Sequence, residues 1–472
     1  SRPMVLVLTV VVLQSISFTN YALTTKTTNI IYGSAPYLTF DGGRTRVTNT
    51  AALLRISLSD GRKFTPATNN SSFDNPIVLP VAGQSFNDIG MLVPTDTYYI
   101  ALSSLIGTPY NYWGDDDGDG QGVNGVTATG SLRLSIVDKD NNRVARNEVL
   151  TMCKAPYKLI LSNGEGTLTT RYGVPNESRF TAGNATYYIN PKAAPVICFA
   201  RPNVGDSRYI WSRGLSDTVW DREKGFLPQS VTPSSYGLNF PTTGANKFWF
   251  YLAIGGISQA LSWAPVSHGG ITATMTDSTS TSVKVTLTGP AVTDPNQWQS
   301  DNPVGIARPS LPQIFELVGR DSSGNAVVKY GFELKQWFVN RGTYYGNNLS
   351  MSSWCNKIRY RLTKMRDLTN ASCLWWPEPC QGAVIATPAS PDRYFRRHIG
   401  AGFFTEWGNM GDYTGTNFPP NIPVRFYYWT QDRWGSSQKF FLVHSENGVI
   451  GASDRNNSNT DEYRYIGLCV YP

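Results

Sequence analysis

The densest set of potential metal ligands in the sequence lies in the stretch "GDDDGDGQG". Asp115, Asp117 and Asp119 stand at alternate positions, and a glycine then precedes Gln121. Alternate carboxylates can converge on one hard cation, and the Gln121 carbonyl would supply the next oxygen. We therefore predict a structural calcium site here. The position that carries the bidentate glutamate of an EF-hand is Val126, so the alternative is an acidic, solvated turn.

Sequence motifs of several catalytic chemistries are missing. The chain contains no H-E-x-x-H, G-x-S-x-G or Walker sequence and has only 3 histidines. These absences predict a protein that is not an enzyme. A carbohydrate-active enzyme stays open as an alternative and would need a cleft with two acidic residues about 5–10 Å apart.

The chain has 6 cysteines and no C-x-x-C pair. This pattern favours disulfide bridges in an exported protein over free thiols, a zinc site or a thioredoxin-like pair. Six cysteines allow many connectivities. The pairing that we favour is Cys153–Cys198, Cys355–Cys469 and Cys373–Cys380.

Two adjacent tryptophans stand in "CLWWPEPC", between the cysteines of the third pair. Neighbouring side chains of an extended segment point to opposite sides, so we expect Trp375 or Trp376 to be exposed. An exposed tryptophan in a pinned loop is a good anchor for a protein or a sugar ring. The alternative is that both rings pack under neighbouring loops. Further residues are expected on the same receptor-binding surface: Arg393, Arg396, Arg397 and Trp407.

The stretch Ser353–Leu368, "SWCNKIRYRLTKMRDL", joins basic residues to a cysteine and is predicted to be helical. Trp354 and Ile358 are four positions apart and predict one apolar face, which leaves the basic side chains mostly toward solvent. A solvated basic face is favoured over a contact patch for acidic glycans or lipid head groups. Basic neighbours would activate Cys355 as a thiol, but a bridge that closes the last domain is favoured.

These residues must be positioned by β-structure. Charged residues make up 16% of the 472 residues and aromatic residues 12%, and Gly, Thr, Ser and Asn are abundant, which favours all-β modules joined by polar turns. The net charge of +7 is modest for this length and no long block of like charge occurs, which argues against a nucleic-acid partner. No segment is long and apolar enough to predict a transmembrane span.

Alternating strands on either side of a polar turn recur along the chain. Predicted hairpins turn at Asp60–Gly61, Asp138–Asn142 and Asp321–Asn325, and the stretch "TATMTDSTSTSVKVTLTG" predicts another. Their spacing is typical of Ig-like β-sandwiches. The predicted domains are a β-sandwich over 23–160, a second one with long loops over 161–345, and a compositionally different domain over 346–472.

The first residues predict export. "MVLVLTVVVLQ" has the length of a signal-peptide core and is followed by "SISFTNYA", with Ala22 as the cleavage point, so residues 1–22 form the predicted signal peptide. The alternative is a buried strand of a module that is truncated at its start.

The last domain resembles bacterial C-type-lectin-like domains. The resemblance is carried by "WCNKIRYRLTKMRDL", "GAGFFTEWG", "YYWTQDR", "KFFLVHSENGVIG" and "YIGLCVYP". The chain departs from the usual pattern at Thr363–Lys364, where the family has Pro-Thr, and it lacks the Glu-Pro-Asn, Gln-Pro-Asp and Trp-Asn-Asp sets of calcium-dependent lectins. The matching residues are Trp354, Cys355, Arg361, Leu362, Tyr428, Trp429 and Cys469.

From about residue 30 onward the chain resembles large enterobacterial surface proteins of Salmonella and Escherichia, which carry adhesion repeats and are similar to invasin and intimin. Segments that carry this resemblance include "NYWGDDDGDGQGVNGVTATGSL", "GFLPQSVTPSSYGLNFPTTGAN" and "GFELKQWFVNRG". It implies an adhesin of the bacterial cell surface or outer membrane, whose partner is a host cell-surface protein or glycan. The alternatives are a structural spacer and a carbohydrate-binding module.

The predicted fold class is therefore mainly β, with tandem Ig-like β-sandwich modules followed by a C-terminal C-type-lectin-like α+β domain. The sandwich part follows from the strand pattern, and the lectin-like part follows from the resemblance.

Overall fold

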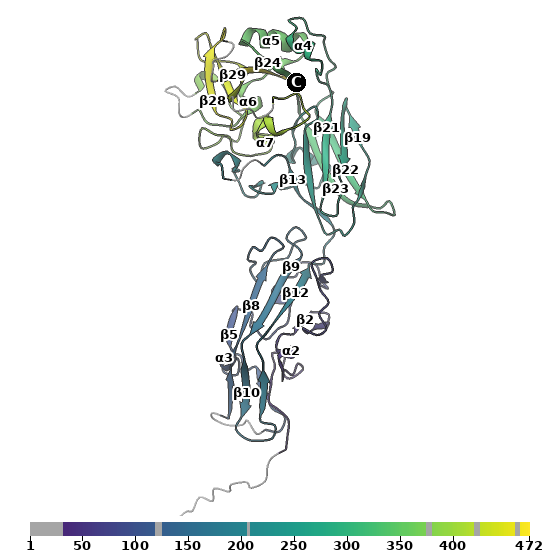
Figure 1. Cartoon of the computed structure of the whole chain (residues 1–472), viewed down its shortest axis with the longest axis vertical. Helices are drawn as coiled ribbons and strands as arrows, with labels where there is room; N and C mark the ends of the chain where they lie inside the picture. The colour runs from purple at the N-terminus through teal and green to yellow at the C-terminus, as the bar shows by residue number, and fades with distance from the viewer. Residues whose placement is uncertain (1–31, 119–124, 205–207, 374–379, 420–424, 458–462) are drawn as a thin grey trace, which may run out of the picture.

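The computed structural model describes residues 32–118, 125–204, 208–373, 380–419, 425–457 and 463–472. The signal peptide predicted over 1–22 lies outside these ranges. The described chain forms an elongated molecule with two separate hydrophobic cores (Figure 1). We name its two parts the N-terminal unit, residues 32–190, and the C-terminal unit, residues 196–472.

The main sheet of the N-terminal unit has the strand order β4-β12-β9-β8-β5, and a smaller sheet with the order β11-β10-β7 extends it. The main sheet consists of β4 (Ile77–Val78), β12 (Gly183–Asn190), β9 (Tyr157–Asn163), β8 (Ser131–Val137) and β5 (Tyr99–Ala101). The remaining strands are β11 (Glu177–Phe180), β10 (Gly166–Thr170), β7 (Val126–Thr129) and the pairs β1 (Tyr37–Leu38) with β6 (Trp113–Gly114) and β2 (Ile56–Ser57) with β3 (Lys63–Phe64).

Alternation of apolar and polar residues explains this sheet. In β8 the side chains of Leu132, Leu134 and Ile136 are all buried, while Arg133 and Ser135 between them are exposed. The predicted turn after β8 is present, because the Asp138 carboxylate accepts hydrogen bonds from the backbone of Asp140 and Asn142. After the turn the chain pairs back on β8 only through an isolated antiparallel bridge, Val137 with Arg143, and not through the predicted strand. The strands that pair with β8 are β9 and β5.

The first half of the C-terminal unit is a β-sandwich, which we name the sandwich module (196–334). Phe250 on one sheet packs against Phe332 on the other, with ring centroids 6.0 Å apart. One sheet consists of β14 (Trp220–Asp221), β15 (Gly225–Phe226), β13 (Val196–Arg201), β17 (Trp249–Gly255), β21 (Ser282–Thr288), β20 (Ile271–Thr276) and β19 (Val266–His268). The other consists of β18 (Ser262–Trp263), β22 (Gln313–Arg320) and β23 (Ala326–Leu334).

The second half, which we name the α+β module (336–472), is built on a mixed sheet. Its order is β16-β24-β29-β26-β27-β28, with β25 beside β29. The strands are β16 (Thr243–Ala245), β24 (Gln336–Tyr345), β29 (Tyr463–Tyr471), β26 (Arg425–Arg433), β27 (Lys439–His444), β28 (Ile450–Asp454) and β25 (Arg361–Leu362). Helices α5 (Asn348–Lys357), α6 (Met365–Leu368) and α7 (Phe403–Trp407) pack on it.

Short helices complete both units. They are α2 (Thr50–Leu53), η1 (Phe86–Asp88), α3 (Leu102–Leu105), η2 (Ile210–Ser212), η3 (Pro233–Leu238), α4 (Pro295–Gln299), η4 (Cys380–Gly382) and η5 (Met410–Asp412). The helix predicted across Ser353–Leu368 is divided. α5 ends at Lys357, and Arg359 has a φ of 74°, a left-handed conformation that breaks the helix before β25.

The predicted fold class is confirmed: the protein is mainly β, with sandwich-like sheets followed by an α+β module. The predicted domain boundaries are wrong. Residue 160 lies inside β9, whose partners β8 and β12 belong to the same sheet, so the first unit extends to Asn190. Residue 345 lies at the end of β24, and the residues on both sides of it share one hydrophobic core. Sheet pairing over long sequence distances sets both limits.

The predicted hairpins at Asp60–Gly61 and Asp321–Asn325 are present as β2–β3 and β22–β23. The Thr/Ser-rich stretch also forms its predicted hairpin, β20–β21. All three predicted disulfide pairs are formed: Cys153–Cys198, Cys355–Cys469 and Cys373–Cys380.

Candidate functional site

Three residues predicted for the receptor-binding surface are buried. Arg396, Arg397 and Trp407 expose 8%, 2% and 0% of their surface. They cannot form a contact face with a partner, and this part of the prediction is wrong. Their burial has a physical reason, since each of them fastens the α+β module to the sandwich module.

Arg397 binds the backbone of both modules. Its guanidinium donates to the carbonyl oxygens of Glu406 (2.8 Å) and Asn203, and it lies over the ring of Trp220, 4.7 Å from the centroid. Burial lowers the pKa of Arg397 to about 10, which still leaves the side chain charged at neutral pH. An arginine that is matched by carbonyl oxygens and an aromatic face inside the protein has a structural role.

Arg396 also binds across this junction. Its guanidinium donates to the carbonyl oxygen of Ile210 (2.6 Å) and forms an ion pair with Asp392 (2.5 Å). Only Arg393 of this basic group is exposed, and its guanidinium lies 4.9 Å from the ring centroid of Tyr394.

Glu406 is a buried carboxylate that sequence reasoning missed. It accepts hydrogen bonds from the backbone and hydroxyl groups of Thr242 and Thr243 and from the backbone of Gly400, at 2.5–3.2 Å. Burial raises the pKa of Glu406, and these hydrogen bonds act in the opposite direction. The neighbouring Trp407 indole donates to the Thr243 carbonyl oxygen at 3.1 Å. The signal in the sequence was "FFTEWG", a single carboxylate in an otherwise uncharged, aromatic-rich stretch.

The predicted tryptophan anchor, Trp375 and Trp376, lies outside the described residues. The bridge between Cys373 and Cys380 that closes this loop is present. Next to it, the Ser372 amide donates to the Asp392 carbonyl oxygen at 2.9 Å. The base of the loop therefore lies beside the segment that carries the exposed Arg393.

The basic stretch is a scaffold with a solvated face. Trp354 and Ile358 are buried as predicted, and Lys357, Arg359 and Arg366 are exposed. Cys355 is bonded to Cys469 on β29, so it is not a reactive thiol.

Side-chain carboxylates hold the start of α6, directly after Thr363. The Met365 amide donates to the Asp432 carboxylate at 2.6 Å, and the Lys364 amide donates to the Asp367 carboxylate at 2.7 Å. These carboxylates satisfy backbone donors of the first turn that have no partner inside the helix.

The predicted calcium ligands are only partly described. Asp119 and Gln121 lie outside the described residues, whereas Asp115 and Asp117 lie directly after β6. The Asp117 carboxylate accepts a hydrogen bond from the Ser34 amide at 2.6 Å. Among the described residues, no cluster of three or more acidic, histidine or cysteine side chains has a metal-binding arrangement. The calcium site stays a prediction.

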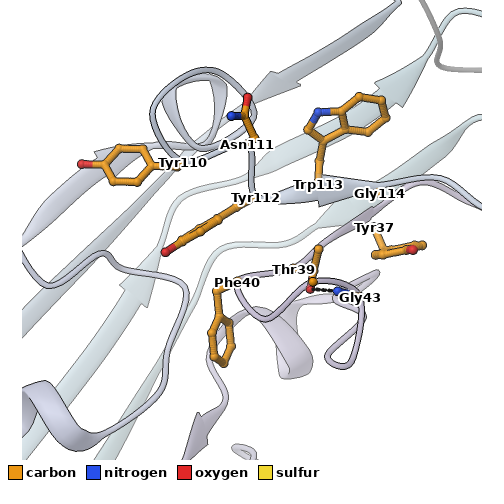
Figure 2. Close-up of a pocket in the computed structure, with 10 residues that line it drawn as sticks. Tyr37, Thr39, Phe40, Gly43, Tyr110, Asn111, Tyr112, Trp113 and Gly114 are labelled. Carbon is orange, nitrogen blue, oxygen red and sulfur yellow. Dashed lines mark hydrogen bonds between the residues drawn. The ribbon is translucent and has the colours of Figure 1, made fainter.

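A pocket in the N-terminal unit was not predicted as a site. It lies beside the pair β1–β6 and has a cavity volume of about 430 Å³ (Figure 2). Its lining is rich in aromatic side chains and consists of Tyr37, Thr39, Phe40, Gly42, Gly43, Tyr110, Asn111, Tyr112, Trp113 and Gly114. The signal was present in the sequence as "YNYWG".

No protein-family model and no curated protein matches the chain. Among solved structures, invasin, a bacterial integrin-binding protein, is similar with 13% identity and a TM-score of 0.34, over 74% of this chain and 52% of invasin. A C-terminal 282-residue fragment of intimin, in complex with the intimin-binding domain of the translocated intimin receptor, is similar with 11% identity and a TM-score of 0.31, over 73% of this chain and 94% of the fragment. This chain thus spans about half the length of the invasin structure. At these values the likeness carries no argument about what this chain binds.

None of the helices in the described residues has the length and hydropathy of a membrane-spanning helix.

Proposed function

We propose that the protein is an exported adhesin of a bacterial surface, which attaches to a host cell-surface protein or glycan through its α+β module. The observation that carries the proposal is the position of this module. It lies at the end of the elongated molecule opposite to the end at which the described chain begins (Figure 1). A binding face at that end is held away from whatever anchors the N-terminal side.

Packing of the C-terminal unit supports this role, because a contact face binds best when its supports do not move. The core of the α+β module continues into the sandwich module through edge-to-face contacts of the Trp407 ring with Phe240 and Phe248. The bridge between Cys355 and Cys469 fixes α5 to the last strand. Such a support loses little conformational freedom when a partner binds.

The contact residues in this proposal are Trp375 and Trp376, in the loop closed by Cys373 and Cys380. Tryptophan is enriched among residues that dominate binding energy at protein interfaces, and a closed loop limits the entropy lost on binding. Arg393, exposed beside the base of this loop, is placed to add a charged contact at the rim.

Saturable binding of the oxidised full chain to cultured epithelial cells tests the proposal. The Trp375→Ala/Trp376→Ala double variant is expected to lose at least about tenfold in affinity, because one hot-spot side chain contributes about 2 kcal/mol or more. Leu349→Ala is the matched control, since it removes another exposed apolar side chain from the same module (51% exposed) and is expected to bind like the wild type.

Each outcome has a distinct meaning. If both variants bind as tightly as the wild type, the contact face lies elsewhere on the molecule. Absence of binding by the folded wild-type chain would contradict adhesion to these cells and favour a structural spacer. An equal loss in both variants would indicate general apolar adsorption in place of a defined site.

A further inference from the structure

The aromatic pocket of the N-terminal unit is far from the α+β module and plays no part in the proposed attachment (Figure 1). Its lining contains no Asp, Glu, Lys, Arg or His side chain. The volume of about 430 Å³ lies within the range of about 300–1,000 Å³ that small-molecule sites occupy. The pocket therefore suits an uncharged ligand of moderate size.

The wall on the side of β1 is built by close packing of a tyrosine on a glycine. Tyr37 is the register partner of Gly114, and a Cβ atom at Gly114 would lie 2.6 Å from the Tyr37 ring. Only glycine leaves room for the ring in this position. The Tyr37 hydroxyl donates to the Asp116 carboxylate at 3.1 Å, and burial together with this bond raises the pKa of Tyr37. The hydroxyl consequently stays neutral.

A tight turn forms the floor. The Thr39 hydroxyl donates to the Asp41 carboxylate at 3.0 Å and accepts from the Gly43 amide at 2.8 Å (Figure 2). Gly42 and Gly43 both have positive φ angles, 68° and 91°, which glycine adopts without strain. Backbone without side chains at this turn leaves the cavity open.

The other walls are aromatic rings that are supported from behind. Phe40, Tyr110, Tyr112 and Trp113 are half-buried and pack against the core of the N-terminal unit. Tyr110 is further held by hydrogen bonds from its hydroxyl to the Asp96 carboxylate at 3.0–3.1 Å. Figure 2 shows Tyr110, Tyr112 and Phe40 on one side of the view and Trp113 and Tyr37 on the other.

Asn111 adds a polar group to these apolar surfaces. It is exposed and has a φ of 52°, a conformation that asparagine tolerates better than most residues. Within the described ranges its carboxamide forms no hydrogen bond, so both its donor and its acceptor are available. Together with the phenol and indole groups, it gives the pocket neutral hydrogen-bonding partners.

We propose that this pocket binds a neutral carbohydrate, with a sugar ring placed against Trp113 and its hydroxyl groups bonded by Asn111. A sugar ring has apolar C–H faces and a rim of uncharged hydroxyl groups, and the pocket offers aromatic faces and neutral donors and acceptors. At its margin, Arg46 and Asp116 form an ion pair and compensate each other's charge. An acidic glycan finds no unpaired cation among the lining residues.

A proline-rich peptide is the competing ligand, because such peptides also bind aromatic-lined grooves. The sugar is favoured, since the cavity is bounded on one side by the Asp41–Arg44 turn and carries a free carboxamide, whereas an extended peptide needs a groove that continues past both ends.

Titration calorimetry with the oxidised full chain tests the proposal. The probes are cellohexaose, chitohexaose and α-mannohexaose, with an oligogalacturonate as acidic glycan and decaproline as peptide. We expect saturable binding of at least one neutral oligosaccharide. Trp113→Leu keeps an apolar side chain against the core but removes the stacking face, and the affinity is expected to fall about tenfold.

A second variant changes a residue that lies outside the hydrophobic core. Asn111→Gly removes the carboxamide and tolerates the positive φ, and we expect an affinity loss of about threefold to tenfold. The matched control is Tyr99→Ala, which removes an exposed aromatic ring (54% exposed) of the same unit from β5 and should leave binding unchanged.

Several results would overturn the proposal. They are the absence of binding to all three neutral oligosaccharides, neutral-sugar binding that neither pocket variant weakens, and preferential binding of decaproline or of the acidic glycan. Cell attachment through the α+β module would stand in each of these cases, since the cell-binding experiment does not use this pocket.

Discussion

Between the N-terminal and C-terminal units, the bridge Cys153–Cys198 and the ion pair of Lys224 with Asp140 (2.8 Å) join two modules whose cores are separate. Between the sandwich and α+β modules, β16 joins the sheet of the next module in parallel with β24, and one aromatic core runs across. The first junction is a tether at one end of each unit (Figure 1). The second junction is a hydrophobic core that both modules share.

This difference has a consequence for function. A junction that consists of a shared hydrophobic core cannot bend without unpacking aromatic rings. The α+β module therefore keeps a fixed orientation relative to the sandwich module. A tethered junction bends more easily, although close packing limits it: a Cβ atom at Gly255 would lie 2.9 Å from the Met152 carbonyl oxygen. The molecule thus combines a rigid distal unit with one point of adjustment.

The largest effect is expected when the bridge inside the C-terminal unit is removed. The Cys355→Ser/Cys469→Ser double variant opens a loop of sequence separation 114, and the loop-entropy model gives a loss of about 5 kcal/mol. Calorimetry should show a lower transition for the C-terminal unit, and an unchanged one for the N-terminal unit. A shift of both transitions together would contradict the separation of the two cores.

Removal of the bridge Cys153–Cys198, which joins the two units, should destabilise the N-terminal unit. In the Cys153→Ser/Cys198→Ser variant the freed loop, of sequence separation 45, contains β9 to β12 of the N-terminal unit. The N-terminal unit is therefore expected to lose about 4 kcal/mol, while the C-terminal unit stays unchanged. Pulsed dipolar spectroscopy with one spin label on each unit should show a wider distance distribution. An unchanged distribution would mean that packing alone fixes the junction.

Glu406→Ala tests the junction between the sandwich module and the α+β module. The substitution leaves the amide and hydroxyl donors of Thr242 and Thr243 buried without their acceptor, at a cost of about 3 kcal/mol. Urea unfolding should show the loss only in the transition of the C-terminal unit. Glu165→Ala, at an exposed glutamate of the N-terminal unit, is the control and should change neither transition by more than about 0.5 kcal/mol.

The smallest effect is expected from calcium. If the aspartates after β6 bind the ion, calcium at ten times its dissociation constant stabilises the N-terminal unit by about 1.4 kcal/mol, and chelation with EDTA should remove this gain without changing the C-terminal unit. Asp115→Asn/Asp117→Asn should abolish the response. A chain whose N-terminal transition ignores both calcium and EDTA would contradict the predicted site.

Local patterns in the sequence predicted much of this architecture. Alternation in β8 and the turn residues of β22–β23 are local signals, and the three disulfide pairs were also predicted correctly. The domain limits were not predictable in this way, because β16 pairs with a strand about ninety residues later, Thr243 with Gln336. Neighbouring residues carry no trace of that pairing.

The candidate sites show the same limit. Arg396 and Arg397 have the composition of an exposed basic patch, but their partners are carbonyl oxygens of Ile210 and Asn203, almost two hundred residues earlier in the chain. The aromatic pocket was overlooked for the opposite reason. "YNYWG" becomes a wall only when β6 pairs with β1 and brings Tyr37 over Gly114.

The cell-binding region can be located directly by separating the two units. Residues 193–472 with Cys198→Ser keep the complete core of the C-terminal unit, which a fragment beginning at residue 346 would lose together with β16 and β24. Residues 32–192 with Cys153→Ser form the other half. Binding of both fragments to epithelial cells should be compared with that of the full chain. We predict that the C-terminal unit alone binds and competes with the full chain, whereas binding carried by the N-terminal unit alone would contradict attachment through the α+β module.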